Sequence, residues 1–441
     1  MTRIVDIRTS RLSNFLAFQN DPLGFLVSLL KEGDVVSLRT SRKRPSYIVN
    51  SPEIVQEILV TKEASFRKGR SSNVLRRTIG DGLLTSERED HKRQKKYMQP
   101  AFYKERIQAY ASAVREESAR LGEQLRHGQT IPMHEAMMQL TLSIITRTMF
   151  ATDVEETKAE LAAAVDDTIE RTARTLFSPL ILPLGFPTSG NRIHRQAIRT
   201  LEEMVLASIR EAKRNPDPYR MSMLGMLLDT RDDHGAPLDE TEIRDQMMTM
   251  LLAGHETTAN LLTWIWYVLD RTPEVEKRWT AELSDVEGKN MDHYERYRAL
   301  SYTQQIIQEA LRLYPPAWII LRESEQEVAL LEDDYPARSS FLISPFVMHR
   351  NADIFADPLT FRPERFAPGV PLPPRFAYFP FGGGSRSCIG SHFAMMEATL
   401  ILYELGRRFR FRNVSSLEAT PEPLVSLRMK GGLNVRAERR A

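Results

Sequence analysis

The sequence holds a single cysteine, Cys388, among its 441 residues. One thiol cannot form an intramolecular disulfide, and it cannot supply the several ligands of a cysteine-rich zinc or iron–sulfur site. Long hydrophobic runs are missing as well. The apolar stretch at residues 23–30 stops at Lys31, far short of the ~20 residues that cross a bilayer. Residues 1–9 have no apolar signal core, so we expect a cytoplasmic protein without a membrane anchor.

An excess of charge of either sign is also absent. The formal net charge is +2, with 42% hydrophobic and 27% charged residues. This near-neutral balance argues against nucleic acid as the main partner. The composition is that of an ordinary globular protein. We find no internal repeat and no low-complexity linker, although the length alone would fit two or three domains.

Short strands are expected in two parts of the chain. Residues 35–38 and 47–49 have the composition of strands near the N-terminus. Strand-like and turn segments dominate residues 318–380. Near the end, residues 420–437 are predicted to form a terminal hairpin with its turn at Gly431-Gly432.

Helical periodicity accounts for most of the remaining chain. Residues 102–230 are mainly helical in pattern, with one apolar, proline-rich break at 177–187 that cannot continue a helix. A second periodic segment runs to about residue 270. Asp239 followed by Glu242 is typical of a helix N-terminal cap at its start. At 1.5 Å per residue this helix would be roughly 48 Å long.

The lone cysteine lies in a glycine-rich segment, residues 381–390, which reads Phe-Gly-Gly-Gly-Ser-Arg-Ser-Cys-Ile-Gly. The glycines remove side chains from around the sulfur, and a helix-like run, residues 392–397, follows directly. The positive end of a helix dipole favours a thiolate. Such a sulfur suits either a nucleophile or an axial metal ligand.

These ten residues resemble the haem-ligand signature of the cytochrome P450 superfamily, Phe-x-x-Gly-x-Arg-x-Cys-x-Gly, at every defined position. The resemblance extends over about residues 30–437. It implies that Cys388 is the axial ligand of haem b and that Phe381 belongs to the cofactor site. It also implies one mainly α-helical domain with small β-sheets (an α+β fold) over residues 1–441. The haem would be buried between the long central helix and the cysteine loop and helix. The lack of a membrane anchor resembles the soluble bacterial branch.

The long helix carries Ala-Gly-His-Glu-Thr-Thr at residues 253–258, which resembles the oxygen-activation motif of that family. The resemblance implies that Thr257 and Glu256 are the catalytic residues that deliver protons to dioxygen, and that Gly254 leaves room for dioxygen against the helix. A zinc-protease motif would need a second histidine at position 259, which is alanine.

Charged residues elsewhere match the family in two sets. Glu309 and Arg312, with Arg365 later in the chain, are similar to a network that supports the cysteine loop; on sequence alone, the first two are an ordinary i, i+3 helix pair. The second set would neutralise the haem propionates. By family position it comprises His91, Lys95, Arg322 and Arg386. Lysine at position 95 is a departure, because relatives often carry arginine there and lysine lacks its bidentate fork.

The expected substrate pocket is apolar, which favours a hydrophobic molecule positioned by shape. In the family, the segment that matches the break at 177–187 covers the substrate pocket. The predicted wall residues are Ala253, Ile319, Ile320, Leu83, Leu84, Phe177 and Val425. The run from Glu309 to Ile319 is most similar to soluble bacterial members that accept lipid, fatty acid or terpenoid substrates, an analogy at the level of the family.

The resemblance implies a haem-thiolate monooxygenase that inserts one oxygen atom of O2 into its substrate by hydroxylation or epoxidation. No reductase segment fits into this length, so NAD(P)H electrons would arrive through a ferredoxin or flavodoxin with its reductase. Basic residues at 91–96, with Lys104 and Arg106, would form a docking patch for this acidic carrier. We expect a monomer.

Three other functions remain open from the sequence. A haem-thiolate peroxygenase or isomerase would need no redox partner, but such members often lack the acid–alcohol pair present here. A non-catalytic haem protein would bind hydrophobic ligands without forming product. A cysteine hydrolase is disfavoured because no histidine is identifiably paired with Cys388, and His392 falls inside the following helix pattern.

Overall fold

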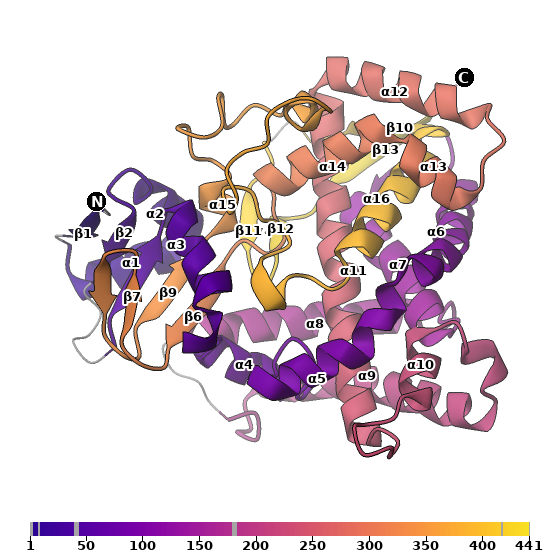
Figure 1. Ribbon diagram of the computed structural model, residues 1–441. Helices are drawn as coiled ribbons and strands as arrows, with labels where there is room; N and C mark the ends of the chain where they lie inside the picture. The colour runs from indigo at the N-terminus through magenta and orange to yellow at the C-terminus, as the bar shows by residue number, and fades with distance from the viewer. Residues whose placement is uncertain (1–2, 8, 39–43, 179–182, 416–417, 441) are drawn as a thin grey trace. The chain divides into compact units, whose positions relative to one another are not determined.

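The computed structural model describes residues 3–7, 9–38, 44–178, 183–415 and 418–440 (Figure 1). The chain forms two compact units. The first unit comprises residues 1–73, 309–361 and 368–388, and the second comprises residues 74–308, 362–367 and 389–441. The structure is mainly α-helical with small sheets, as predicted. The organisation of the whole chain as one domain stays a prediction.

A six-stranded mixed sheet forms the centre of the first unit. Its strands, in spatial order, are β1 (Ile4–Asp6), β2 (Val35–Ser37), β3 (Ser46–Val49), β9 (Ser340–Ile343), β6 (Ile320–Ser324) and β4 (Phe66–Arg67). Aromatic rings pack together on this sheet, with Phe341 in contact with Tyr47, Phe66 and Tyr335. A separate hairpin joins β7 (Val328–Leu330) to β8 (Asp333–Tyr335). The strands predicted at 35–38, 47–49 and within 318–380 are therefore confirmed.

Short helices complete the first unit, and several begin at a capping side chain. Ser10, Asp21 and Ser51 each accept a hydrogen bond from a backbone N–H of the following first turn. The helices are α1 (Arg11–Asn20), α2 (Pro22–Ser28), α3 (Pro52–Gln56), the π-helical turn η1 (Glu57–Thr61), and α15 (Pro345–Met348), with 3-10 turns η2 (Glu63–Ser65) and η7 (Gly384–Arg386). Two further helices, α4 (Arg70–Ile79) and α14 (Ser301–Leu313), contain residues of both units.

Helices dominate the second unit, and α11 (Glu240–Arg271) is the longest of those described, with 32 residues. In Figure 1, α7 lies alongside α11, and α16 lies close to α6. The other helices are α5 (Arg88–Met98), α6 (Lys104–Gln124), α7 (Met133–Ile145), α8 (Lys158–Phe177), α9 (Ser189–Arg214), α10 (Met223–Asp229), α12 (Pro273–Glu287), α13 (His293–Ala299) and α16 (Ser391–Gly406). Short helical turns are η3 (Gln99–Phe102), η4 (Thr146–Phe150), η5 (Asp217–Tyr219) and η6 (Pro363–Phe366).

The predicted break in the helical region is confirmed, because α8 ends at Phe177 and α9 begins at Ser189. Residues 179–182 of that break lie outside the described residues. The start of α11 was predicted at the right place, but the predicted cap was wrong in its chemistry. Asp239 occupies the N-cap position without a side-chain capping bond. Glu242, which would complete the cap, instead pairs with Arg93 of α5, with 3.2 Å between Oε1 and Nη2.

The predicted terminal hairpin was wrong in its turn. β11 (Pro421–Pro423) pairs with β12 (Leu427–Met429), so the hairpin turn lies at residues 424–426. Gly431 and Gly432, both with positive φ, lead from β12 into β13 (Asn434–Arg439). That strand joins a different sheet, between β10 (Phe409–Asn413) and β5 (Thr130–Pro132). The glycine pair does supply a turn, but the buried Val435 and Ala437 select β10 as partner.

Candidate active site

The loop that carries Cys388 belongs to the first unit, and it is compact because glycines let the backbone approach its neighbours. Gly384 has φ +69°, and a Cβ there would overlap the carbonyl of Leu59 in η1. A Cβ at Gly383 would overlap the ring of Phe376. The Cys388 N–H donates to the carbonyl of Phe381 at 2.9 Å, which closes the loop, and the Cys388 side chain is exposed.

A carboxylate that the sequence did not reveal also holds this loop. The N–H of Ser385 donates to Glu63 Oε2 at 3.2 Å, and the Ser385 hydroxyl donates to the other oxygen of the same carboxylate. Glu63 lies in η2, more than 300 residues away in the chain. The loop geometry therefore depends on a contact with a distant segment as well as on its own glycines.

The donor set around Cys388 fits haem better than a metal held only by protein side chains. Within the described ranges there is no group of three or more His, Cys, Asp or Glu side chains able to hold a metal ion. A metal bound to this sulfur would take its remaining ligands from a non-protein group, as iron in a porphyrin does.

The predicted propionate partners all lie on ordered elements. Arg386 lies in η7 and Arg322 on β6, both partly buried in the first unit. His91 and Lys95 lie one turn apart on α5 in the second unit, with His91 buried. Their roles stay predictions.

The Glu309–Arg312 pair on α14 is fully buried. The i, i+3 spacing alone would suggest an exposed surface pair with no further contacts. Arg312 Nε and Nη2 donate to the two oxygens of Glu309, each at 2.8 Å. Its Nη1 donates to the carbonyls of His349 and Pro358 at 2.8 and 2.7 Å. This part of the predicted network is present within the first unit. The participation of Arg365 stays a prediction.

The predicted oxygen-activation segment lies in the middle of α11. The Thr257 hydroxyl donates to the carbonyl of Ala253 at 3.0 Å, one turn earlier in the same helix. A Cβ at Gly254 would stand 2.8 Å from Cδ1 of Ile145 on α7. Close packing of α7 on α11 is therefore a sufficient physical reason for glycine at this position, in addition to the predicted room for dioxygen.

Glu256 is buried and forms an ion pair that was not predicted from the sequence. Its Oε1 accepts from Nε of Arg428 at 2.7 Å, and the guanidinium also donates through Nη2 to Asp166 of α8 at 2.9 Å. Asn260, one turn after Glu256, donates to the Ser426 hydroxyl at 2.7 Å. Arg428 and Ser426 come from the β11–β12 hairpin, so this hairpin is joined to α11 by two polar contacts.

Two histidines lie beside this ion pair, of which His255 is buried and His134 is partly buried. Burial lowers the pKa of His255 on α11 and of His134 on α7 to about 4 in each case, and the charge of Arg428 also lowers both. The Nδ1 of His255 lies 2.7 Å from the Leu251 carbonyl, so that nitrogen carries the proton in the neutral ring. Both side chains are therefore neutral at pH 7.

These histidines predict a loss of stability in mild acid. Unfolded histidine takes up a proton near pH 6.5, whereas each folded one resists until about pH 4. Between these values the unfolded state binds more protons, so the free energy of unfolding falls as the pH falls, by up to about 1.4 kcal/mol per pH unit for each histidine. Urea unfolding at pH 7.5, 6.0 and 5.0 should show a smaller pH dependence in His255→Gln than in the wild type. Parallel curves would contradict this assignment.

The loop that carries Leu83 and Leu84 is attached to the first half of α11. The N–H of Asp81 donates to Asp245 Oδ2 at 2.6 Å, and the N–H of Leu83 donates to Gln246 Oε1 at 2.9 Å. A Cβ at Gly82 would overlap Thr249. Leu83 is buried and Leu84 is exposed.

Four of the other predicted wall residues are partly buried, and the role of all of them as pocket walls stays a prediction. Ala253 lies on α11 and Val425 in the β11–β12 turn. Ile320 is the first residue of β6, and Ile319 directly precedes it. Phe177 is the last residue of α8, and its side chain lies outside the described part of the structure.

The predicted docking patch is largely paired with carboxylates. On α5, Lys92 pairs with Glu89, Arg93 with Glu242 and Lys96 with Asp233. Arg106 donates through Nη1 to backbone carbonyls, that of Met221 at 2.7 Å. These contacts reduce the positive field that the sequence run suggested.

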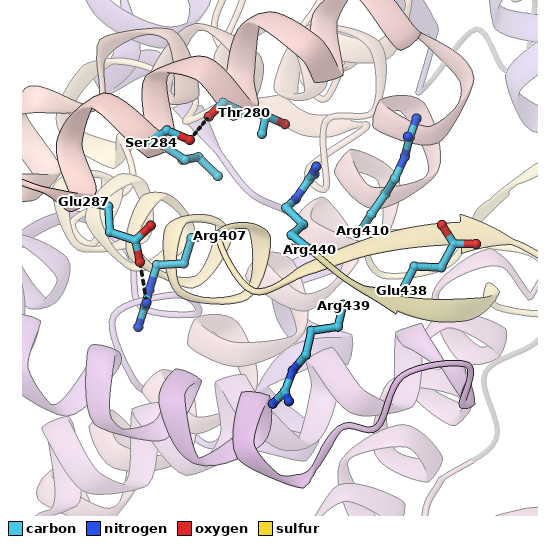
Figure 2. Close-up of a pocket in the computed structure, with 9 residues that line it drawn as sticks. Thr280, Ser284, Glu287, Arg407, Arg410, Glu438, Arg439 and Arg440 are labelled. Atoms are coloured by element: carbon cyan, nitrogen blue, oxygen red, sulfur yellow. Dashed lines mark hydrogen bonds and ion pairs between the residues drawn. The ribbon is translucent and has the colours of Figure 1, made fainter.

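A separate pocket of about 370 Å³ opens in the second unit (Figure 2). It is lined by Thr280, Leu283, Ser284, Glu287, Arg407, Arg410, Glu438, Arg439 and Arg440. None of the predicted site residues is among them. Three of its arginines pair with carboxylates: Arg407 with Glu287 at 2.8 Å, Arg410 with Glu276 at 2.5 Å, and Arg440 with Glu276 at 3.0 Å. We therefore assign it no part in the chemistry.

Comparison with known proteins defines the class. The family described as Cytochrome P450 matches residues 11–433. Cyclooctatin synthase of Streptomyces melanosporofaciens is 36% identical over 415 residues, covering 93% of this chain and 90% of the relative. Cyclooctat-9-en-7-ol 5-monooxygenase of the same organism is 34% identical over 408 residues, covering 91% and 88%. Pentalenene oxygenase of Streptomyces avermitilis is 33% identical over 410 residues, covering 92% and 90%.

The chain belongs to the cytochrome P450 family. It is a haem-thiolate monooxygenase that uses haem b, acts on a hydrophobic substrate, and receives electrons derived from NAD(P)H through a redox partner. Among the described residues, no helix is long and apolar enough to cross a membrane.

Proposed function

We propose that this monooxygenase hydroxylates or epoxidises a terpenoid hydrocarbon or alcohol. The observation that carries the proposal is its similarity over about nine-tenths of its length to relatives named for cyclooctat-9-en-7-ol and pentalenene. The predicted wall residues are apolar, which suits a substrate held by shape with few polar contacts.

Spectral titration tests the substrate class. Addition of a cyclic terpenoid alkene to the haem-loaded protein should shift its absorption from low spin to high spin, and addition of a saturated fatty acid of similar carbon number should not. The reverse preference would remove terpenoids as the substrate class while leaving the monooxygenase assignment intact.

The proposed roles of the chain's own groups follow from their chemistry. Haem supplies the site at which dioxygen is activated. Cys388 would bind it through the sulfur, with Phe381 beside it, and the propionates would be held by His91, Lys95, Arg322 and Arg386. Thr257 would donate a hydrogen bond to dioxygen, and Glu256 would pass on protons from solvent.

We propose that a ferredoxin or flavodoxin with its reductase delivers the electrons to a cytoplasmic monomer. A weak, fast encounter of this kind is steered by charge. Product formation with ferredoxin, its reductase and NADPH supports this arrangement. Turnover with hydrogen peroxide alone, and none with any reduced carrier, would favour a peroxygenase.

Thr257→Ala is expected to uncouple oxygen consumption from product formation. The variant lacks the hydroxyl that would donate a hydrogen bond to dioxygen. Protons are then not directed to the correct oxygen atom, and the reduced dioxygen is released as hydrogen peroxide. Oxygen uptake should persist and peroxide should rise, while product falls by about 100-fold, the lower end of what a positioned proton-transfer group contributes.

An oxygen electrode with parallel product and peroxide assays measures this coupling. Thr263→Ala, which removes a hydroxyl hydrogen-bonded to its own helix in the same way at 2.8 Å, is the matched control. Unchanged coupling in Thr257→Ala would remove this residue from the mechanism.

A further inference from the structure

A single guanidinium joins a buried carboxylate on α11 to a half-exposed carboxylate on α8. Arg428 reaches Glu256 at 2.7 Å through Nε and Asp166 at 2.9 Å through Nη2. The exposed fractions of the three side chains rise steadily, from 3% for Glu256 to 13% for Arg428 and 46% for Asp166. The three groups thus form a continuous charged path from the interior of the second unit to solvent.

The two carboxylates keep the guanidinium of Arg428 protonated. Burial acts to lower the pKa of Arg428, but the two carboxylates outweigh burial and raise that pKa, so the guanidinium remains charged. A buried carboxylate is tolerated only when it is paired and hydrogen-bonded. For Glu256 the described partners are Arg428 and, at 3.4 Å, the amide of Asn260. Arg428 is therefore the counter-charge on which the Glu256 carboxylate depends.

The path reaches the segment that contains the proposed proton-delivery residues. Glu256 immediately precedes Thr257 on α11. The other ionisable groups near Glu256 are His255 on α11 itself, His134 on α7 and Glu397 on α16, which faces Thr258. Burial lowers the pKa of each histidine to about 4 and raises the pKa of Glu397 to about 8, so all three are neutral near pH 7. Among the described residues, the cation in contact with Glu256 and Asp166 is Arg428.

We propose that Arg428 is a positioning residue for proton delivery, which holds the Glu256 carboxylate in place one residue before Thr257 and is itself held by the half-exposed Asp166. The guanidinium keeps its protons, so it orients Glu256 without relaying a proton. This inference rests on the proposed role of Glu256. It assigns to the β11–β12 hairpin a function in the reaction, because Arg428 lies on β12 and its neighbour Ser426 accepts from Asn260 of α11.

Arg428→Met in the full-length, haem-loaded protein tests the proposal with a readout that needs no turnover. Methionine has a similar length but no charge, so the variant leaves a buried carboxylate unpaired, and such a group takes up a proton instead. Infrared spectroscopy near neutral pH should then show a new carboxylic-acid carbonyl band. That band should be absent from the double variant Arg428→Met/Glu256→Gln.

Turnover supplies the second readout. The ratio of product to hydrogen peroxide should fall on the order of tenfold in Arg428→Met, a part of the ~100- to 10,000-fold that positioned acid–base groups contribute. The solvent deuterium isotope effect on product formation should rise. Arg428→Lys keeps a charge but cannot bridge two carboxylates with one planar fork, so it should restore the coupling only in part.

Arg412→Met is the matched control. It removes a strand-to-α11 ion pair of the same kind, Arg412 to Asp270 at 3.0 Å. Asp270 lies fourteen residues after Glu256 on the helix, about 21 Å away at 1.5 Å per residue. Arg412→Met should leave both the infrared spectrum and the product-to-peroxide ratio unchanged.

Different outcomes test the positioning role of Arg428 and the proposed function separately. A wild-type ratio in Arg428→Met, or the absence of the new infrared band, would overturn the positioning role. If Arg428→Met does not fold, Asp166→Asn replaces it, because that side chain is half-exposed; a wild-type ratio there would equally overturn the proposal. Asp167→Asn is its control. If the wild type forms no product with any carrier, the proposed function fails, whereas the infrared test of Arg428 still stands.

Discussion

Replacing Cys388 with histidine is expected to abolish both the long-wavelength Soret band of the reduced, carbon monoxide-bound protein and the formation of product. That band requires thiolate ligation, and the sequence holds no second cysteine to take over. The loss of activity should exceed the ~10- to 100-fold that removal of an outer-shell partner costs a metal site. Absorption spectra and product assays on the same preparations make the measurement.

Ser387→Ala is the control for this substitution. It changes the adjacent, exposed residue of the same loop without removing sulfur, and it should keep the band. A long-wavelength band that survives in Cys388→His would disprove thiolate ligation by this residue. A colourless wild-type protein that cannot be reconstituted with haem would refute the cofactor assignment itself.

The second large effect, a loss of folding stability, is expected when Arg312 is replaced. Arg312→Met leaves the fully buried Glu309 carboxylate without its partner and removes the donors to the carbonyls of His349 and Pro358. Breaking a buried pair in this way costs about 3–5 kcal/mol. A domain is stable by only about 5–15 kcal/mol in total. The variant should therefore unfold at much lower urea concentration and retain little haem.

An exposed pair of opposite charges supplies the control for Arg312→Met. Lys289 and Asp285 form an i, i+4 contact at 2.6 Å near the end of α12. Lys289→Ala should change the free energy of unfolding by only about 0.3–0.5 kcal/mol. If Arg312→Met is no less stable than Lys289→Ala, the buried pair does not stabilise the fold.

Local patterns allowed the sequence to predict much of this protein. The helices, the break after Phe177 and the i, i+3 spacing of Glu309 and Arg312 all depend on residues close together in the chain. The Cys388 motif is likewise a run of ten neighbours. In each of these cases the physical signal lies within a few residues, so a sequence pattern is sufficient to find it.

The predictions that failed, and the contacts that were missed, depend on residues far apart in the sequence. The cap at Asp239 fails because Glu242 pairs with Arg93, which lies 149 residues away. Arg428 was missed because its neighbours Leu427 and Met429 indicate only a strand, whereas its partner Glu256 is 172 residues distant. Choice of partner strand caused the hairpin error in the same way. Such contacts depend on the tertiary arrangement, which periodicity does not encode.

The attachment of the Asp81–Leu83 segment to α11 has a consequence for protein engineering. Two backbone hydrogen bonds to Asp245 and Gln246, and a glycine with no space for a Cβ, fix the length of this segment. Insertions or deletions here would break those bonds, whereas the exposed Leu84 can be exchanged without touching them. Libraries that test the predicted role of Leu84 as a pocket wall should therefore randomise position 84 and leave the loop length alone.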